Sequence, residues 1–307
     1  MRIVSLLASG TEIVCGLGAG ADLAGRSHEC DNPEWVRELP VCTRPAFDVE
    51  VSSGEIDAEV RRRFKTGEPL YHVDTELIRR LEPDLLITQE HCEVCAVTPN
   101  DIARTGSTTL VPQVIALSAG SVRGIYDGIL AVGEAIQRSV AAATLVDEMQ
   151  RRMTAIGDAV RHKPVPSVVM LEWTDPIFSM GNWGPELVEA ANGRLLLGQA
   201  GQHSAAISWE TVCSADPDFL IIAPCGYHLE KSRREAAILE ALPGWLELRA
   251  VRDGKVVFAD GNKFFNRSGT TIVETVEIIA EILHSSKTQP RWEEKAWQSY
   301  VPSLADA

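Results

Sequence analysis

The sequence predicts an α/β fold that consists of two Rossmann-like lobes with mostly parallel sheets, joined by one long linker helix. Three observations lead to this prediction. A short apolar strand, a polar turn and an amphipathic helix alternate along the chain, which is typical of a parallel sheet covered by helices on both faces. One strand-forming segment recurs in each half of the chain, and a helical segment without proline separates the two halves.

The first half of the chain carries three predicted strands. We expect strands over residues 2–7, 84–88 and 109–117, and helices over residues 11–17, 76–81 and 122–137. The helix at 76–81 must end before Pro83, because proline has no N–H to continue the helical hydrogen bonds.

The second half repeats this order. Strands are expected at residues 167–171, 218–222 and 255–259, and helices at residues 185–191, 235–242 and 270–283. Residues 77–88 and 211–223 resemble each other, because in both a helix stops before Pro-Asp and an apolar strand follows at once. Two related lobes are therefore expected.

A single helix is predicted to join the lobes. Residues 138–161 contain no proline, and apolar residues recur there at three- and four-residue spacing: Leu145, Met149, Met153, Ile156 and Val160. This stripe is more typical of packing than of a cofactor site, and at about 1.5 Å per residue the helix would span roughly 36 Å.

We therefore expect an N-terminal lobe over residues 1–137, the linker helix over 138–161, a C-terminal lobe over 162–287 and a tail over 288–307. We expect the tail, with Trp292, Trp297 and Tyr300, to dock on the body of the protein, a partner site being the weaker alternative.

The composition is that of an ordinary globular protein, with 45% hydrophobic and 23% charged residues among 307. The 29 Lys and Arg against 43 Asp and Glu give a formal charge of −14, which would repel a nucleic acid or an anionic membrane. No stretch approaches the roughly 18 apolar residues of a membrane span. The first residues lack the basic start, apolar core and cleavage site of a signal peptide. We therefore expect a cytoplasmic protein with a small-molecule or metal-cofactor ligand, no nucleic-acid partner and no membrane span.

Residues that carry chemistry follow the predicted strands, at the carboxyl edge where open α/β sheets bind ligands. In the first half these loops comprise residues 8–12, 26–31 and 89–95. In the second half they comprise residues 172–176 together with 180–184, then 224–228 and 260–267.

Cysteines and histidines gather in these loops: Cys30, Cys92, Cys95, Cys225, His28 and His91. Thiolates and imidazoles are good ligands for zinc, copper(I) and iron, so the four cysteines are candidate metal ligands. The alternative is that they are small buried hydrophobic residues, and this is the favoured interpretation for Cys15, Cys42 and Cys213. Seven cysteines in all, an odd number, argue against a disulfide framework.

Aromatic residues occur on the same loops: Trp173, Trp183, Phe264 and Phe265. Aromatic side chains near strands usually belong to the core, yet two tryptophans on ligand-edge loops suit a flat conjugated ligand. The chain has no Ser-His-Asp order and no zinc-protease motif. We therefore expect a binding protein with no catalytic residues, and an enzyme acting on a small molecule is the weaker hypothesis.

The chain resembles the helical-backbone metal receptors, the group of class III periplasmic-binding-protein-like proteins that includes vitamin B12 and iron-siderophore receptors. The resemblance covers residues 1–287 and rests on the segments 3–12, 81–87, 243–245, 250–256 and 266–269 and on the single long helix. Within the group it looks most like the cytoplasmic cobalamin-binding branch, which shares the patterns of residues 27–31 and 92–95.

The resemblance implies a rigid two-lobed receptor that holds its ligand between the lobes. We expect it to bind a metal-bearing cofactor, cobalamin or a related corrinoid, with His28 or a thiol as axial ligand. The expected cofactor-binding residues are Ser9, His28, Glu29, Trp173, Asp175, Trp183, Tyr227, Phe265 and Arg267. The alternative hypothesis is a protein-ligated zinc or iron–sulfur site formed by Cys30, Cys92, Cys95 and Cys225, with redox activity left open.

Overall fold

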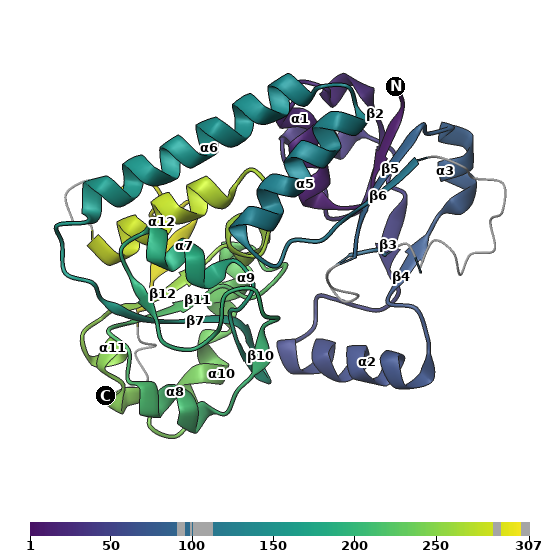
Figure 1. The fold of residues 1–307 in the computed structure, drawn as a ribbon. Coiled ribbons are helices and arrows are strands. Elements are labelled where there is room, and N and C mark those ends of the chain that lie inside the picture. Colours follow the sequence, from purple (N-terminus) through teal and green to yellow (C-terminus); the bar gives the residue numbers. More distant parts are fainter. Residues whose placement is uncertain (91–95, 99, 101–112, 285–289, 302–307) are drawn as a thin grey trace. The chain divides into compact units, whose positions relative to one another are not determined.

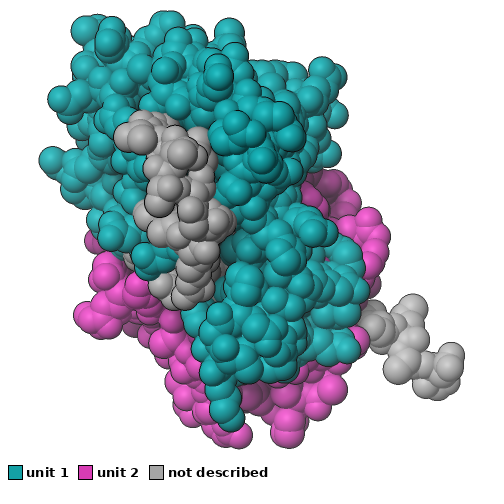
Figure 2. Space-filling model, turned by 90° about the vertical axis from the view of Figure 1, so that its right-hand side faces the viewer, with its two compact units in different colours: residues 1–150, 268–270 teal, residues 151–267, 271–307 magenta. Residues whose placement is uncertain are grey.

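The computed structural model describes residues 1–90, 96–98, 100, 113–284 and 290–301 (Figure 1). The chain forms two compact units, coloured in Figure 2. Unit 1 comprises residues 1–150 and 268–270, and unit 2 comprises residues 151–267 and 271–307. The long helix α6 (Ser139–Val160) begins in unit 1 and ends in unit 2, as the proline-free segment predicts.

Unit 1 is built on a parallel sheet with the strand order β2-β1-β5-β6 in its described part. These strands are β1 (Ile3–Ser5), β2 (Leu23–Arg26), β5 (Leu85–Gln89) and β6 (Gln113–Leu117). The helices α1 (Ala8–Gly16), α3 (Thr75–Leu81) and α5 (Val122–Ala135) connect or flank them, with short 3₁₀ turns at Gly20–Asp22 and Glu34–Glu38. One face of the sheet packs into a core of Val4, Leu6, Cys42, Ile78, Leu86 and Val97.

A hairpin extends unit 1 beyond its main sheet. Strands β3 (Thr43–Pro45) and β4 (Tyr71–Val73) pair in antiparallel fashion, and the helix α2 (Ser53–Thr66) lies between them in the chain. Ser52 and Glu55 form a capping box at the start of α2, and Gly67 ends the helix in the left-handed conformation. Only Ser53 of α2 is buried, so this helix depends on its caps and on ion pairs such as Arg63–Glu59 at 2.8 Å.

Unit 2 contains a mixed sheet whose described strands follow the order β10-β8-β7-β11-β12-β13, with β9 also paired to β7. At its centre β7 (Ser167–Thr174), β11 (Phe219–Ile222) and β12 (Val256–Ala259) run parallel. The short strands β8 (Ile177–Ser179), β10 (Ala205–Ala206) and β13 (Trp297–Ser299) join in antiparallel fashion, and β9 (Arg194–Leu195) joins in parallel.

Helices cover both faces of the unit 2 sheet (Figure 1). One face carries α7 (Gly184–Ala190) and α12 (Ile272–His284), and the other carries α8 (Trp209–Ala215), α10 (Ala236–Glu240) and α11 (Arg249–Arg252). The helix predicted at residues 235–242 is preceded in the structure by a further helix, α9 (Leu229–Arg234). A 3₁₀ turn at Trp245–Glu247 and a π-helical turn, η4 (Gly261–Phe265), complete the unit.

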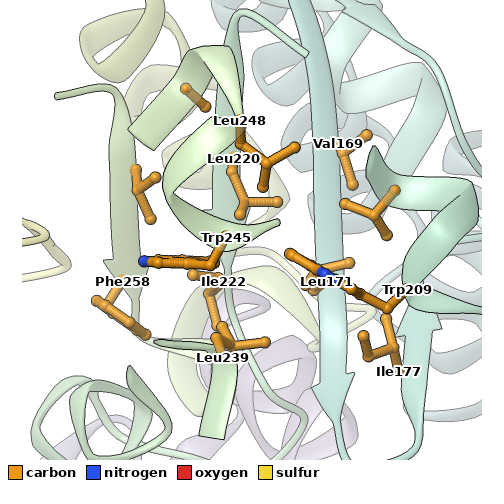
Figure 3. Packing of buried hydrophobic residues seen from close by; sticks show 13 residues of the cluster. Val169, Leu171, Ile177, Trp209, Leu220, Ile222, Leu239, Trp245, Leu248 and Phe258 are labelled. Atoms are coloured by element: carbon orange, nitrogen blue, oxygen red, sulfur yellow. The ribbon is translucent and has the colours of Figure 1, made fainter. Parts of the chain in front are cut away.

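Trp245 lies at the centre of the core on the second of these faces (Figure 3). Its ring stacks on that of Trp209 at a centroid distance of 6.0 Å and packs among Leu220, Ile222 and Phe258 of the sheet. Burying two tryptophans and these aliphatic side chains removes a large apolar area from water, at roughly 25 cal/mol per Å². This core fixes the central strands whose ends form the site described below.

The recurrent Pro-Asp segment has the same structural role in both units. In unit 1, Asp84 accepts the backbone N–H of Arg2, just before β1, at 2.8 Å. In unit 2, Asp218 accepts the backbone N–H of Ser167, the first residue of β7, also at 2.8 Å. Each aspartate therefore fastens the start of its own strand to the start of the neighbouring parallel strand.

The structure confirms the predicted fold class, with two α/β units, parallel central strands and one long connecting helix. Among the described helices, none has the length and apolar character needed to cross a membrane.

Candidate functional site

Three loops meet at one edge of the unit 2 sheet. Because β7, β11 and β12 run parallel, their carboxyl ends lie at the same edge, where α/β sheets bind ligands. The first comprises residues 172–175, which are the last residues of β7 and the one that follows it. The others comprise residues 223–228 after β11 and residues 260–267 after β12. We refer to them together as the ligand-edge loops.

Backbone hydrogen bonds tie the ligand-edge loops to one another. The N–H of Cys225 donates to the carbonyl of Glu172 at 2.9 Å, and the N–H of Asn262 donates to the carbonyl of Tyr227 at 3.1 Å. Backbone-to-backbone bonds hold their partners independently of side-chain rotamers, so the loops form one rigid frame. The site residues are therefore placed by the backbone of the sheet edge.

Trp173 and Tyr227 form an aromatic pair in this frame. Their ring centroids are 5.3 Å apart in an edge-to-face arrangement, and the indole Nε1 of Trp173 donates to the carbonyl of Asp175 at 3.0 Å. Lys231 places its Nζ 4.2 Å from the centroid of the Tyr227 ring. Tyr227 is buried and Trp173 is half-buried, so the indole is the more accessible member of the pair. Three residues expected from the sequence, Trp173, Asp175 and Tyr227, are thus brought together.

Arg267 lies across the η4 turn as a buried cation, with only 4% of the residue exposed. Its Nε donates to the carbonyl of Asn262 at 3.1 Å, and its Nη2 donates to Asn262 Oδ1 at 3.2 Å. Phe265 has no exposed surface and contributes to the packing of unit 2. Trp183 is 8% exposed at the start of α7, and its Nε1 has no hydrogen-bond acceptor among the described residues.

The sequence reasoning missed two polar residues of the ligand-edge loops, His228 and Asn262. The side chain of His228 is 61% exposed, with Nδ1 3.9 Å from Asp260 Oδ2 and 3.4 Å from Asn262 Nδ2. Asn262 therefore contacts both His228 and Arg267. The signal was present, since both residues follow predicted strands, but an isolated histidine or asparagine has no pattern that separates it from its neighbours.

In unit 1, the hairpin orients His28 after β2. The Nδ1 of His28 lies 2.8 Å from Thr43 Oγ1, and its ring lies 5.5 Å from that of Tyr71. Its Nε2 is 3.3 Å from a carboxylate oxygen of Glu29. Ser9, in the first turn of α1, is 1% exposed, and its Oγ has no hydrogen-bond partner among the described residues.

The four candidate metal-binding cysteines have different settings. Cys30 is fully buried in unit 1, where its Sγ accepts from Thr11 Oγ1 at 3.0 Å and lies 3.3 Å from Ser27 Oγ. Cys225 is half-buried in a ligand-edge loop of unit 2. Cys92 and Cys95, like His91, lie outside the described residues. In the described ranges no three His, Cys, Asp or Glu side chains are grouped so as to hold a metal ion.

Among the cysteines interpreted as packing residues, Cys42 is buried and Cys15 and Cys213 are half-buried. Burial raises the pKa of the Cys42 thiol to about 12 and that of the Cys15 thiol to about 11, and it also raises the pKa of Cys213. Cys42 belongs to the core cluster of unit 1. At neutral pH these groups are protonated thiols, which bind metal poorly.

Comparisons with known proteins agree with this architecture. The profile of a family described as periplasmic binding protein matches residues 3–262. The chain is 25% identical over 293 residues to the uncharacterized ABC transporter substrate-binding lipoprotein YvrC of Bacillus subtilis, covering 92% of this chain and 80% of that protein.

Solved structures with related folds include a heme-binding and a vitamin B12-binding protein. A periplasmic heme-binding protein from Pseudomonas aeruginosa matches with a TM-score of 0.72 and 19% identity, covering 98% of both chains. The periplasmic vitamin B12 binding protein BtuF of Vibrio cholerae matches with a TM-score of 0.65 and 18% identity, covering 92% of this chain and 96% of the other. At these identities the similarity shows a shared fold.

These findings overturn the expectation of a cytoplasmic protein. The matching family is that of periplasmic binding proteins, and the relative from Bacillus subtilis is a substrate-binding lipoprotein. The expectation rested on the residue pattern at the start of the sequence, and the family match over residues 3–262 contradicts it. Within the family, the resemblance to a cobalamin-binding branch stays a prediction.

The expectation of a binding protein rather than an enzyme is confirmed, because the matching family consists of receptors. The match spans most of the chain, and the two α/β units with one long connecting helix have the architecture of these receptors. The chain belongs to the periplasmic binding protein family.

Proposed function

We propose that this protein is the substrate-binding protein of an ABC transporter and that its ligand is a metal-bearing macrocycle, a corrinoid in the first place. The observation that carries the proposal is the accessible indole of Trp173 on the ligand-edge loops, braced by Tyr227. A half-buried indole supported by a buried tyrosine ring, at the carboxyl edge of a parallel sheet, offers an apolar surface to a conjugated or macrocyclic ligand.

The polar residues around this pair support the proposal. His228, Asn262 and Lys231 supply hydrogen-bond donors next to the aromatic surface. A ligand pocket of this kind combines apolar walls with a few fixed polar groups, and the edge of a corrin ring carries amide groups that such side chains can recognise. The similarity to heme- and vitamin B12-binding structures supports a macrocyclic ligand.

The predicted site also includes residues of unit 1 and the candidate metal-binding cysteines. In unit 1, His28 is the candidate axial ligand, since Thr43 fixes its Nδ1 side at 2.8 Å. The place of the ligand between the two lobes, and a thiolate metal site that includes Cys92 and Cys95, stay predictions.

Isothermal titration with hydroxocobalamin tests the proposal. Burying an aromatic ring against a ligand contributes roughly 1.5–3 kcal/mol, so Trp173→Ala should weaken binding by about tenfold or more. Trp173→Phe retains part of the ring and should lose less. Trp35→Ala is the matched control, because Trp35 is 45% exposed on a 3₁₀ turn of unit 1 and belongs to none of the ligand-edge loops.

The rival ligand class is tested in the same way with hemin. If hemin binds and hydroxocobalamin does not, the ligand is a porphyrin and the corrinoid proposal is wrong. If hydroxocobalamin binds equally well to the wild type and to Trp173→Ala, Trp173 is not part of the site.

A further inference from the structure

Residues 290–301, which we call the C-terminal strap, lie beyond the part of the chain that the family profile matches. The strap adds the strand β13 to the free side of β12, pairing Phe258 with Gln298 and Ala259 with Trp297. The hydrogen bonding continues past the strand, since the N–H of Asp260 donates to the carbonyl of Ala296 at 2.8 Å. The strap therefore reaches the first residue of the loop that follows β12.

One carboxylate anchors the strap. Glu281 lies on α12, and its Oε1 accepts from the backbone N–H groups of Trp292 at 2.9 Å and Glu293 at 3.1 Å and from the indole Nε1 of Trp297 at 2.9 Å. Its Oε2 accepts from the backbone N–H of Arg291 at 2.7 Å. Hydrogen bonds to an ionised acceptor are about twice as strong as neutral ones, and here four donors converge on a single side chain.

The anchored strap is in turn packed against the η4 turn. The ring of Trp292 meets the ring of Phe264 edge to face, with centroids 5.4 Å apart. Asp260, held by the strap through its N–H, caps the turn by accepting the N–H of Lys263 at 2.7 Å. On the other side, Thr275 of α12 donates its hydroxyl to the carbonyl of Phe264 at 2.8 Å.

This turn is the part of the ligand-edge loops that carries Asn262 and leads into Arg267. Asn262 accepts from Arg267 and contacts His228, so the position of η4 determines where these polar groups lie. A π-helical turn is rare and occurs mostly as a single turn, so we expect it to depend on contacts from neighbouring segments. In the described residues, the strap and α12 supply contacts of this kind.

We propose that Glu281 is a positioning residue: it fixes the C-terminal strap, and the strap fixes the η4 turn of the ligand-edge loops. As far as ligand affinity is concerned, this inference rests on the proposed function. The positioning itself does not, because it concerns contacts within unit 2.

Hydrogen exchange followed by mass spectrometry tests the positioning without any ligand. Glu281→Ala should speed exchange by about tenfold or more in residues 290–301 and in residues 260–267, while β7 and β11 keep their protection. Glu281→Gln should give an intermediate result, because its amide oxygen can still serve the three donors on the Oε1 side. Glu274→Ala is the matched control, since Glu274 lies on the same helix and pairs with Arg152.

Trp292→Ala provides a variant in case Glu281→Ala does not fold. It removes the ring that packs on Phe264 and leaves the carboxylate anchor in place, so exchange should rise in residues 260–267. If Glu281→Ala loosens the strap while the turn keeps its wild-type rates, or if Trp292→Ala leaves the turn fully protected, the positioning role is wrong. If Glu281→Ala changes hydrogen exchange in neither segment, Glu281 does not anchor the strap.

Titration with hydroxocobalamin then links the strap to the site. If the wild type binds, Glu281→Ala should bind at least about tenfold more weakly, and Glu281→Gln should lie between the two. If Glu281→Ala loosens the turn but leaves the affinity for hydroxocobalamin unchanged, the strap does not affect ligand binding. Failure of the wild type to bind would count against the proposed function alone, because the exchange result still decides the positioning.

Discussion

Gly261 packs so tightly against the carbonyl oxygen of Pro224 that no side chain fits at residue 261. The Cβ of an alanine there would overlap this oxygen and lie 2.7 Å from the carbonyl oxygen of Ala223. Both are backbone oxygens of the loop after β11, so no change of side-chain rotamer can make room. The close approach is what brings the loop after β12 onto the loop after β11.

Gly261→Ala should therefore destabilise unit 2 and separate two of the ligand-edge loops. Overpacking of this kind costs about 1–3 kcal/mol or more of the free energy of unfolding, measured by urea denaturation. Gly124→Ala is the control, because the nearest atoms to its Cβ are at 3.4 Å and alanine favours the helix α5. Equal stability of the two variants would show that the loops can move apart freely.

The link between Asp218 and Ser167 gives a stability that depends on pH. The hydroxyl and backbone N–H of Ser167, at 2.6 and 2.8 Å, together with Arg249 lower the pKa of Asp218 to about 2. Because this value lies below the ordinary value of about 3.9, the stabilisation is complete above about pH 4 and is lost as the pH falls towards 2.

Asp218→Asn should accordingly lower the free energy of unfolding by about 1.5–3 kcal/mol at pH 7. In urea titrations the difference from the wild type should shrink between pH 4 and pH 2. A difference that stays constant over this range would mean that the charge of Asp218 does not contribute. Ser167→Ala, which removes the hydroxyl alone, should show a smaller loss with the same trend.

The sequence predicts the frame of the site better than its side chains. The Pro-Asp repeat indicates two related units, and Asp84 and Asp218 do play equivalent parts in them. The order of strands and turns indicates which loops reach the carboxyl edge, because that follows from parallel pairing alone. It does not indicate which side chain of a loop is buried. Phe265 is fully buried in the π-helical turn η4, and the residue pattern does not predict a turn of this type.

Hydrogen bonds between residues distant in the sequence are the second feature of the site that the sequence did not predict. The bond between His28 and Thr43 joins residues 15 positions apart, and the anchor from Glu281 to Trp297 joins residues 16 apart. Cys30 follows β2, as expected for a residue at the sheet edge, yet its thiol is buried and accepts a hydrogen bond from Thr11 of α1. Such contacts depend on packing between elements and leave no local pattern.

Thr43 should contribute to the stability of the His28 region. Its Oγ1 accepts the backbone N–H of His28 at 3.1 Å and meets the ring nitrogen at 2.8 Å, and Thr43 is 3% exposed. Thr43→Val keeps the shape but leaves a partly buried N–H without its acceptor, which should cost about 1–3 kcal/mol in urea denaturation. Thr144→Val on the outer side of α6, where the hydroxyl bonds only within its helix, should change stability by less than about 0.5 kcal/mol. Similar losses in the two variants would contradict this role.

Cys42 should be less reactive than Cys225. It has no exposed surface, and burial raises its pKa to about 12, so at pH 8 only about one molecule in 10⁴ carries the thiolate. Iodoacetamide at pH 8, with peptides resolved by mass spectrometry, should label the half-buried Cys225 while Cys42 stays unmodified until urea unfolds the protein.

The pKa of Cys42 in the folded protein is above the ordinary value of about 8.5, so the contribution of Cys42 to stability is present below that pH and is lost as the pH rises towards 12. Cys42→Ala should therefore approach the wild type in stability as the solution becomes alkaline. Labelling of Cys42 as fast as Cys225 in the folded protein would show that the core of unit 1 opens to solvent.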